Sequence, residues 1–181
     1  TPVKVEPGRT TSGIDFTLAK VETRPRVYID PARSGVRVGS SGRVAVSVAH
    51  VSDLGAFEAA LAWDPGVLRV DGVALGDFLG STGRQVVPVE PVIDNAQGTL
   101  AFAAGSIGRQ AGPNGGGVLF AVEFTVLQVG TTGVEVTRSV LTTPSGRQID
   151  HDRGSGQVVV GECMLGDFDC NCVIDVRDVM A

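Results

Sequence analysis

The stretch VAVSVAHVSDLGAFEAALAWDPGVLRVDGVALGDFL, residues 44–79, decides the fold. Apolar side chains alternate in it with small or polar ones, which is the period of a strand that buries one face. In the middle of the stretch, the side chains predicted to point inward are Phe57, Ala59, Leu61 and Trp63. Those predicted to point outward are Ala56, Glu58, Ala60 and Ala62. Pro65 then fixes a turn, so Asp64 is interpreted as a turn cap and not as a catalyst.

Similar short segments continue along the chain at regular intervals. They cover residues 26–30, 42–51, 56–64, 67–75, 84–93, 98–106, 116–129, 132–141 and 156–162. Turn sequences such as Asp64-Pro65-Gly66 separate them, and no strand alternates with a helix. With 25 Gly, 9 Pro and 5% aromatic residues, this pattern predicts an all-β protein built as an antiparallel β-sandwich.

The longest segment, residues 118–129, is expected to cross the whole core as one strand. Its apolar face is predicted to hold Val118, Phe120, Val122, Phe124 and Val126. Its other face is predicted to hold Leu119, Ala121, Glu123 and Thr125.

The order of these segments resembles the cohesin domains of cellulosome scaffolds. The resemblance rests on residues 44–79, on NAQGTLAFAAGS (95–106) and on GGGVLFAVEFTVLQVGTTGV (115–134), and it covers about residues 30–160. It implies a jelly-roll sandwich without catalytic activity. It also implies a partner, because cohesins use one sheet face, which includes the 56–62 strand, to dock the helices of a dockerin.

On the neighbouring 99–105 strand, Thr99, Ala101, Ala103 and Gly105 are predicted to point outward. The resulting flat surface would suit the close approach of a helix. The candidate partner-binding residues are therefore Ala56, Glu58, Ala60, Ala62, Ala101 and Ala103. The alternative is that these small residues only fill a sheet surface.

The last twenty residues carry a different pattern, with acidic side chains two residues apart. Numbered from Asp167, oxygen ligands fall at loop positions 1, 3, 5, 7, 9 and 12, as a hard cation such as calcium requires. The predicted ligands are Asp167, Asp169, Asn171, Val173 through its carbonyl, Asp175 and Asp178. The order resembles the first calcium repeat of a dockerin, followed by a helix stub, although Cys172 stands where such loops prefer glycine. The alternative is a solvated acidic tail.

Three cysteines, Cys163, Cys170 and Cys172, all lie in this tail. Cys163 can pair with either of the other two, and a zinc site is the alternative. The sequence predicts three parts: residues 1–25 as the closing strands of an upstream module with a linker, 26–160 as the sandwich, and 161–181 as the truncated calcium loop. Residues 1–20 resemble, over a short length, the last strands of carboxypeptidase-regulatory-like repeats.

Charge and motifs exclude several functions. The net charge of −5 is concentrated in residues 162–181, so no basic stripe for nucleic acid exists, and no apolar run is long enough for a membrane span. Nucleophile elbows, zinc-binding HExxH motifs and phosphate loops are missing from the sequence. His50 and His151 are expected in solvated positions. Asp150 and Asp152 could act as a pair of catalytic carboxylates, but nothing in the sequence places them in a cleft.

The sequence therefore predicts a non-catalytic, secreted interaction module of a multimodular surface or scaffold protein. Its expected partners are dockerin-bearing chains, among them polysaccharide-degrading enzymes. Two alternatives are a carbohydrate-binding module, which usually needs exposed aromatic side chains, and a structural spacer.

Overall fold

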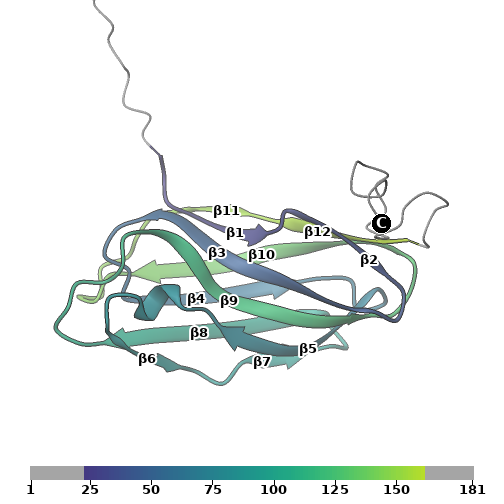
Figure 1. The fold of residues 1–181 in the computed structure, drawn as a ribbon, viewed down its shortest axis with the longest axis horizontal. Helices are drawn as coiled ribbons and strands as arrows, with labels where there is room; N and C mark the ends of the chain where they lie inside the picture. Colours follow the sequence, from purple (N-terminus) through teal and green to yellow (C-terminus); the bar gives the residue numbers. More distant parts are fainter. Residues whose placement is uncertain (1–22, 162–181) are drawn as a thin grey trace, which may run out of the picture.

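The computed structural model describes residues 23–161, which form two packed β-sheets (Figure 1). The five-stranded sheet has the order β11 (Asp152–Gly154), β1 (Arg26–Asp30), β3 (Ser41–Val51), β9 (Gly115–Val126) and β5 (Leu68–Leu75). The seven-stranded sheet has the order β2 (Arg33–Arg37), β12 (Gly156–Gly161), β10 (Gly130–Thr142), β4 (Ala56–Ala62), β8 (Thr99–Ile107) and β6 (Gln85–Pro88). β7 (Val92–Asp94) pairs with the other half of β8, and one 3-10 helix, η1, covers Phe78–Gly80. The predicted all-β sandwich is confirmed.

The core lies between the inner faces of the two sheets. At its centre the rings of Phe57 and Phe120 stack with centroids 5.8 Å apart, and Phe102 meets Phe120 edge to face at 5.2 Å. These rings come from β4, β9 and β8, so they join the two sheets. Offset and edge-to-face aromatic pairs add to the free energy gained by burying the rings.

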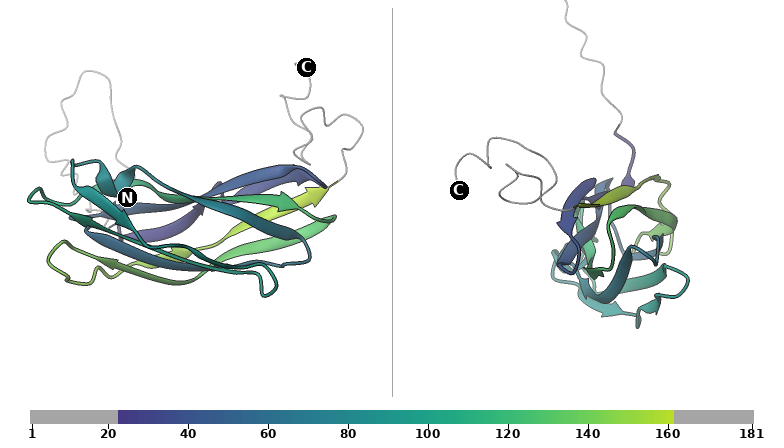
Figure 2. Two further views of the ribbon diagram at one scale, coloured as in Figure 1. Left: turned by 90° about the horizontal axis from the view of Figure 1, so that it is seen from below. Right: turned by 90° about the vertical axis from the view of Figure 1, so that its right-hand side faces the viewer.

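Parallel pairing occurs at the two ends of the described chain. β1 pairs in parallel with β11, and β2 pairs in parallel with β12, while the other pairs are antiparallel. The β1–β2 and β11–β12 ribbons thus pass together from one sheet to the other. The described chain enters at one end of the long axis of the sandwich and leaves at the opposite end (Figure 2).

The prediction for the long strand was wrong only at its start, for Val118 and Leu119. The rest of its apolar face, namely Phe120, Val122, Phe124 and Val126, is buried as predicted. A bulge shifts the register between β3 and β9, with Val46 opposite Phe120 and Ser47 opposite Val118. Leu119 is the extra residue, so Leu119 and Phe120 are both buried whereas Val118 is exposed. The strand also ends at Val126, because residues 127–129 belong to the turn into β10.

Several boundaries also differ from the prediction. The predicted segment 84–93 forms β6 and β7 with a break between them, and the short strands β2 and β11 were not predicted. The predicted upstream hairpin, the calcium ligands and the cysteines lie in residues 1–22 and 162–181, outside the described residues. Within residues 23–161, no helix is long and apolar enough to cross a membrane.

Candidate partner-binding face

The outward residues of β4 and β8 form one continuous surface. The register pairs Ala56 with Gly105, Glu58 with Ala103, Ala60 with Ala101, and Ala62 with Thr99. The inner residues of both strands are buried, as the alternation predicted, and the outward ones are half-buried or exposed. The structure therefore brings all six candidate partner-binding residues onto one face, which we call the platform: the outer face of β10, β4, β8, β6 and β7.

A row of valines borders the platform on one side. Val87, Val89 and Val92 lie along β6, β7 and the break between them, with side chains 45%, 60% and 68% exposed. Val87 is opposite Gly105 and Val92 is opposite Ala101, so both point to the same side as the alanines. Sequence reasoning missed this row, although the segment VVPVEPV (86–92) shows the alternation. Its face depends on its register with β8.

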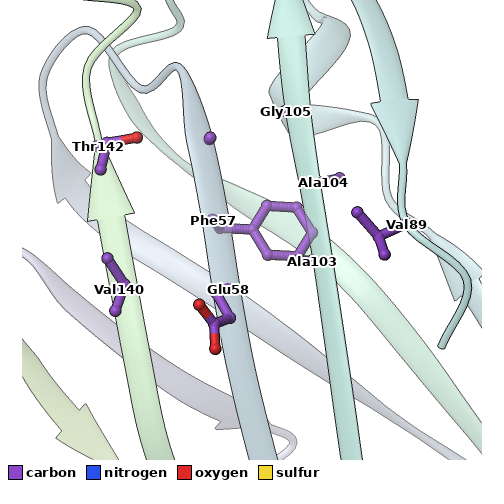
Figure 3. Close-up of a pocket in the computed structure, with 9 residues that line it drawn as sticks. Phe57, Glu58, Val89, Ala103, Ala104, Gly105, Val140 and Thr142 are labelled. Atoms are coloured by element: carbon purple, nitrogen blue, oxygen red, sulfur yellow. The ribbon is translucent and has the colours of Figure 1, made fainter. Parts of the chain in front are cut away.

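β10 borders the platform on the other side. Val140 is opposite Glu58 and Thr142 is opposite Ala56, so both share the outward face. Between the two borders lies a shallow hollow of about 300 Å³ (Figure 3). Its lining residues are Ala56, Phe57, Glu58, Val89, Ala103, Ala104, Gly105, Val140 and Thr142.

Glu58 is the single ionisable side chain in the lining of the hollow. Its carboxylate lies 3.1 Å from the guanidinium of Arg138 on β10. Because both side chains are largely exposed, the pair contributes little to stability. The pair does balance the local charge, so the centre of the platform is apolar and close to neutral.

The edge of the platform is closed to strand addition. Pro88 and Pro91 interrupt the edge formed by β6 and β7, and neither has an N–H group to offer. Val89 between them uses its N–H to donate to Ala103 O at 2.9 Å. A partner can therefore approach the face more readily than the edge.

The turn beneath one end of the platform is held by polar groups. Trp63 Nε1 donates to Leu68 O at 3.0 Å, and Gly66 N donates to Asp64 Oδ1 at 2.8 Å. Asp64 N donates to Thr132 Oγ1 at 2.8 Å. Asp64 is thus a turn cap, as predicted.

The histidines differ from each other. His50 is exposed, whereas His151 is half-buried, so the predicted solvated position is wrong for His151. Its Nδ1 donates to Ile149 O at 2.8 Å, and Nε2 of the neutral ring then accepts a hydrogen bond from Ser139 Oγ at 2.7 Å. Since a carbonyl oxygen only accepts, this arrangement fixes the tautomer. Residues 23–161 contain no cluster of three His, Cys, Asp or Glu side chains suited to a metal ion.

A largely antiparallel sandwich with an apolar, solvent-facing sheet surface is typical of protein-interaction modules. Within this class the chain belongs to the cohesin family, because residues 28–160 match the cohesin domain. Cohesin domains are non-catalytic interaction modules. A search of proteins with curated functions finds no match.

Solved cohesin structures share the fold. The non-cellulosomal cohesin of the archaeon Archaeoglobus fulgidus is 17% identical with a TM-score of 0.61, over 77% of this chain and 93% of that one. The OlpA cohesin of Clostridium thermocellum, solved in a type I complex with a dockerin, is 14% identical with a TM-score of 0.62, over 77% and 100%. The second type II cohesin of the adaptor scaffoldin ScaA of Acetivibrio cellulolyticus is 18% identical with a TM-score of 0.60, over 78% and 92%. At these identities the likeness shows the fold alone.

Proposed function

We propose that this chain is a cohesin module that binds a dockerin-type domain through the platform. The family match supports this function, and so do the similar folds of cohesins that were solved in complex with dockerins. The observation that carries the proposal is the platform itself, where alanines and a glycine from two neighbouring strands form an apolar surface open to solvent. A helix can approach such a surface closely.

The wider context follows from the same proposal. The chain would belong to a secreted or cell-surface protein of several modules that assembles dockerin-bearing partners, polysaccharide-degrading enzymes among them. A carbohydrate-binding role has less support, because the large aromatic side chains Phe57, Trp63, Phe102 and Phe120 are buried in the core. Sugar rings usually stack on exposed aromatic side chains.

A binding assay with a charged variant tests the docking role. The full chain is immobilised and exposed to secreted proteins of its source organism, and captured chains are identified by mass spectrometry. We expect dockerin-bearing chains to be captured, and Ala103→Arg to lose them because an unpaired charge would be buried in the interface. Ala45→Arg, on the outer face of the five-stranded sheet, is the matched control. The absence of dockerins from the captured set, or equal capture by Ala103→Arg, would contradict the proposal.

The predicted calcium loop at Asp167–Asp178 is a separate proposal that rests on the sequence spacing. Calorimetric titration of the full chain with calcium should show uptake by the wild type. Asp169→Ala should abolish that uptake, because it removes a ligand at loop position 3. Uptake that is the same in both proteins would place the calcium elsewhere.

A further inference from the structure

We infer that the hollow between Val89 and Val140 is an anchor pocket for one bulky aliphatic side chain on a helix of the partner. The inference rests on the proposed docking function and adds the chemistry of recognition. Burial of that side chain, and not hydrogen bonding, would then supply most of the affinity. Interfaces commonly concentrate their binding free energy in a few anchors that fill such pockets.

The dimensions of the platform fit a single helix. From β6 to β10 the sheet crosses three strand spacings, or about 14 Å, since neighbouring strands lie about 4.8 Å apart. An α-helix with its side chains is about 10–12 Å in diameter. Val89 and Val140 stand on either side of β4 and β8, so they would flank a helix that rests on the alanines (Figure 3).

The floor of the hollow is open above Gly105. A Cβ atom added at Gly105 would meet only the Cβ of Ala56, at 3.8 Å, which is an ordinary contact distance. The space above this glycine is therefore free of other protein atoms, and Gly105 does not need positive φ. A side chain from the partner can reach the floor of the sheet there.

The lining selects an apolar group. Ala56, Val89, Ala103 and Val140 contribute methyl groups, and Thr142 contributes one hydroxyl-bearing side chain. Glu58 is already paired with Arg138. A charged or amide side chain in this hollow would lose its hydrating water without gaining adequate hydrogen bonds, which disfavours its burial. An aliphatic side chain has no hydrogen bonds with water to lose, and the burial of its apolar surface is favourable.

Other occupants fit less well. An added strand needs a row of free backbone groups, and Pro88 and Pro91 interrupt that row at the edge. A second copy of the chain would place one hollow against another, and the space between the two hollows would stay unfilled. Well-packed interfaces have few voids larger than a water molecule.

Filling the hollow tests the inference. Gly105→Val should weaken binding of the dockerin captured by wild-type protein by about tenfold or more, because the valine occupies the space of the anchor. Gly72→Val is the matched control, since a Cβ added at Gly72 meets no atom within 4 Å and this residue lies on the other sheet. It should leave the dissociation constant unchanged. Thermal unfolding of both variants checks that each is folded.

Salt and the partner side chain provide two further readouts. Raising the salt concentration should change the affinity little, because the contact is apolar. Replacing the anchoring leucine or isoleucine of the dockerin by alanine should weaken wild-type binding and have little added effect on Gly105→Val. Unchanged binding by Gly105→Val, or steep salt dependence, would overturn the anchor inference while leaving the docking function in place.

A probe without any dockerin separates the two proposals. N-acetyl-leucine methylamide should shift the amide resonances of Ala103 and Gly105 in the full chain, and the corresponding serine compound should not. Shifts specific to the leucine compound would support the hollow as an aliphatic site even if no dockerin were captured. Equal shifts with both compounds, or none at these residues, would overturn the inference.

Discussion

The side-chain amide of Asn95 pairs with the backbone of Val70 as a neighbouring strand would. Val70 N donates to Asn95 Oδ1 at 2.8 Å, and Asn95 Nδ2 donates to Val70 O at 2.9 Å. Val70 lies on β5, the edge of the five-stranded sheet, and Asn95 follows β7 of the other sheet. One amide thus closes part of an open edge and joins the two sheets, which protects the edge from pairing with another chain.

Asn95→Asp is expected to destabilise the fold by about 1–3 kcal/mol, because a carboxylate cannot donate to Val70 O and leaves that carbonyl without its partner. Denaturant unfolding of the variant against wild type measures the effect. Gln97→Glu makes the same chemical change at an exposed position of the same turn and serves as control. Equal midpoints for the two variants would show that the Asn95 amide contributes nothing.

Asp71 gives the fold a pH dependence. The hydrogen bond from Thr125 Oγ1, 2.6 Å long, is the main reason that the pKa of Asp71 lies below its ordinary value of 3.8. Burial opposes this shift, and the hydrogen bond and charge of Arg69 lower the pKa further. A lowered folded-state pKa stabilises the fold above the unfolded-state value, and this contribution is lost as the pH falls through the folded-state value. Thr125→Val should therefore reduce stability at neutral pH, with the difference closing below pH 3.8.

Unfolding measurements across this pH range, with an NMR titration of the Asp71 carboxyl group, check the prediction. In Thr125→Val the pKa of Asp71 should move upward, towards the ordinary value. Thr131→Val, at an exposed threonine on β10, should leave the pKa of Asp71 unchanged. A stability difference for Thr125→Val that persists at low pH would point to packing in place of the hydrogen bond.

Arg84 is buried, and none of the carboxylates in residues 23–161 pairs with its guanidinium. Its Nε donates to Ser106 Oγ at 2.9 Å, and its two terminal nitrogens donate to the carbonyl oxygens of Ser106, Gly108 and Gln110 at 2.7, 2.9 and 2.5 Å. These bonds hold the loop that follows β8. Arg84→Met should destabilise the fold by about 2 kcal/mol or more, because three carbonyls lose a charged donor.

Hydrogen exchange in this loop provides a local readout for the same change. Gly112 N donates to Asp53 Oδ1 at 2.7 Å, and we expect its protection to fall in Arg84→Met more than that of the core strands. Arg109→Met, at an exposed neighbouring residue, is the control. Unaltered protection of Gly112 would show that the loop holds its shape without Arg84.

Gly98 is constrained by both conformation and space. Its φ is +64°, and an added Cβ would lie 2.2 Å from Trp63 O. Gly83 also has positive φ, +82°, but meets no atom within 4 Å. Gly83→Ala is expected to cost roughly 1–2 kcal/mol from the left-handed backbone alone, and Gly98→Ala should cost clearly more because Trp63 must move. If Gly98→Ala and Gly83→Ala lost the same stability in thermal unfolding, the backbone near Trp63 would be able to move away from the added Cβ atom without a cost in free energy.

Local alternation predicted the faces of β4 and β8 because both strands are regular and each buries one side. Ala56 and Ala103 were therefore assigned to the correct face from the sequence. The same rule failed only at the start of β9, where the bulge at Leu119 inserts an extra residue, so that Leu119 is buried and Val118 is exposed. A bulge is set by pairing with β3, which is distant in the sequence.

The borders of the platform depend on contacts that no local pattern contains. Val89 lines the hollow because its backbone pairs with Ala103, and Val140 does so because β10 lies beside β4. The pairing of Ser139 with His151 was missed for the same reason, since the two residues lie on opposite sides of a turn. The residue types in the sequence indicated an apolar surface. The valines that border the hollow are brought to it by strand pairing between distant parts of the chain, which the sequence does not show directly.

The parallel pairs β1–β11 and β2–β12 also determine how the module carries mechanical load. The described chain enters and leaves at opposite ends of the long axis, and the paired ribbons run along that axis (Figure 1). Tension applied to both ends would pull the ribbons past each other, so the hydrogen bonds of each ladder would be strained together and not one at a time. The platform faces sideways to this axis, and a bound partner would remain outside the path of the force.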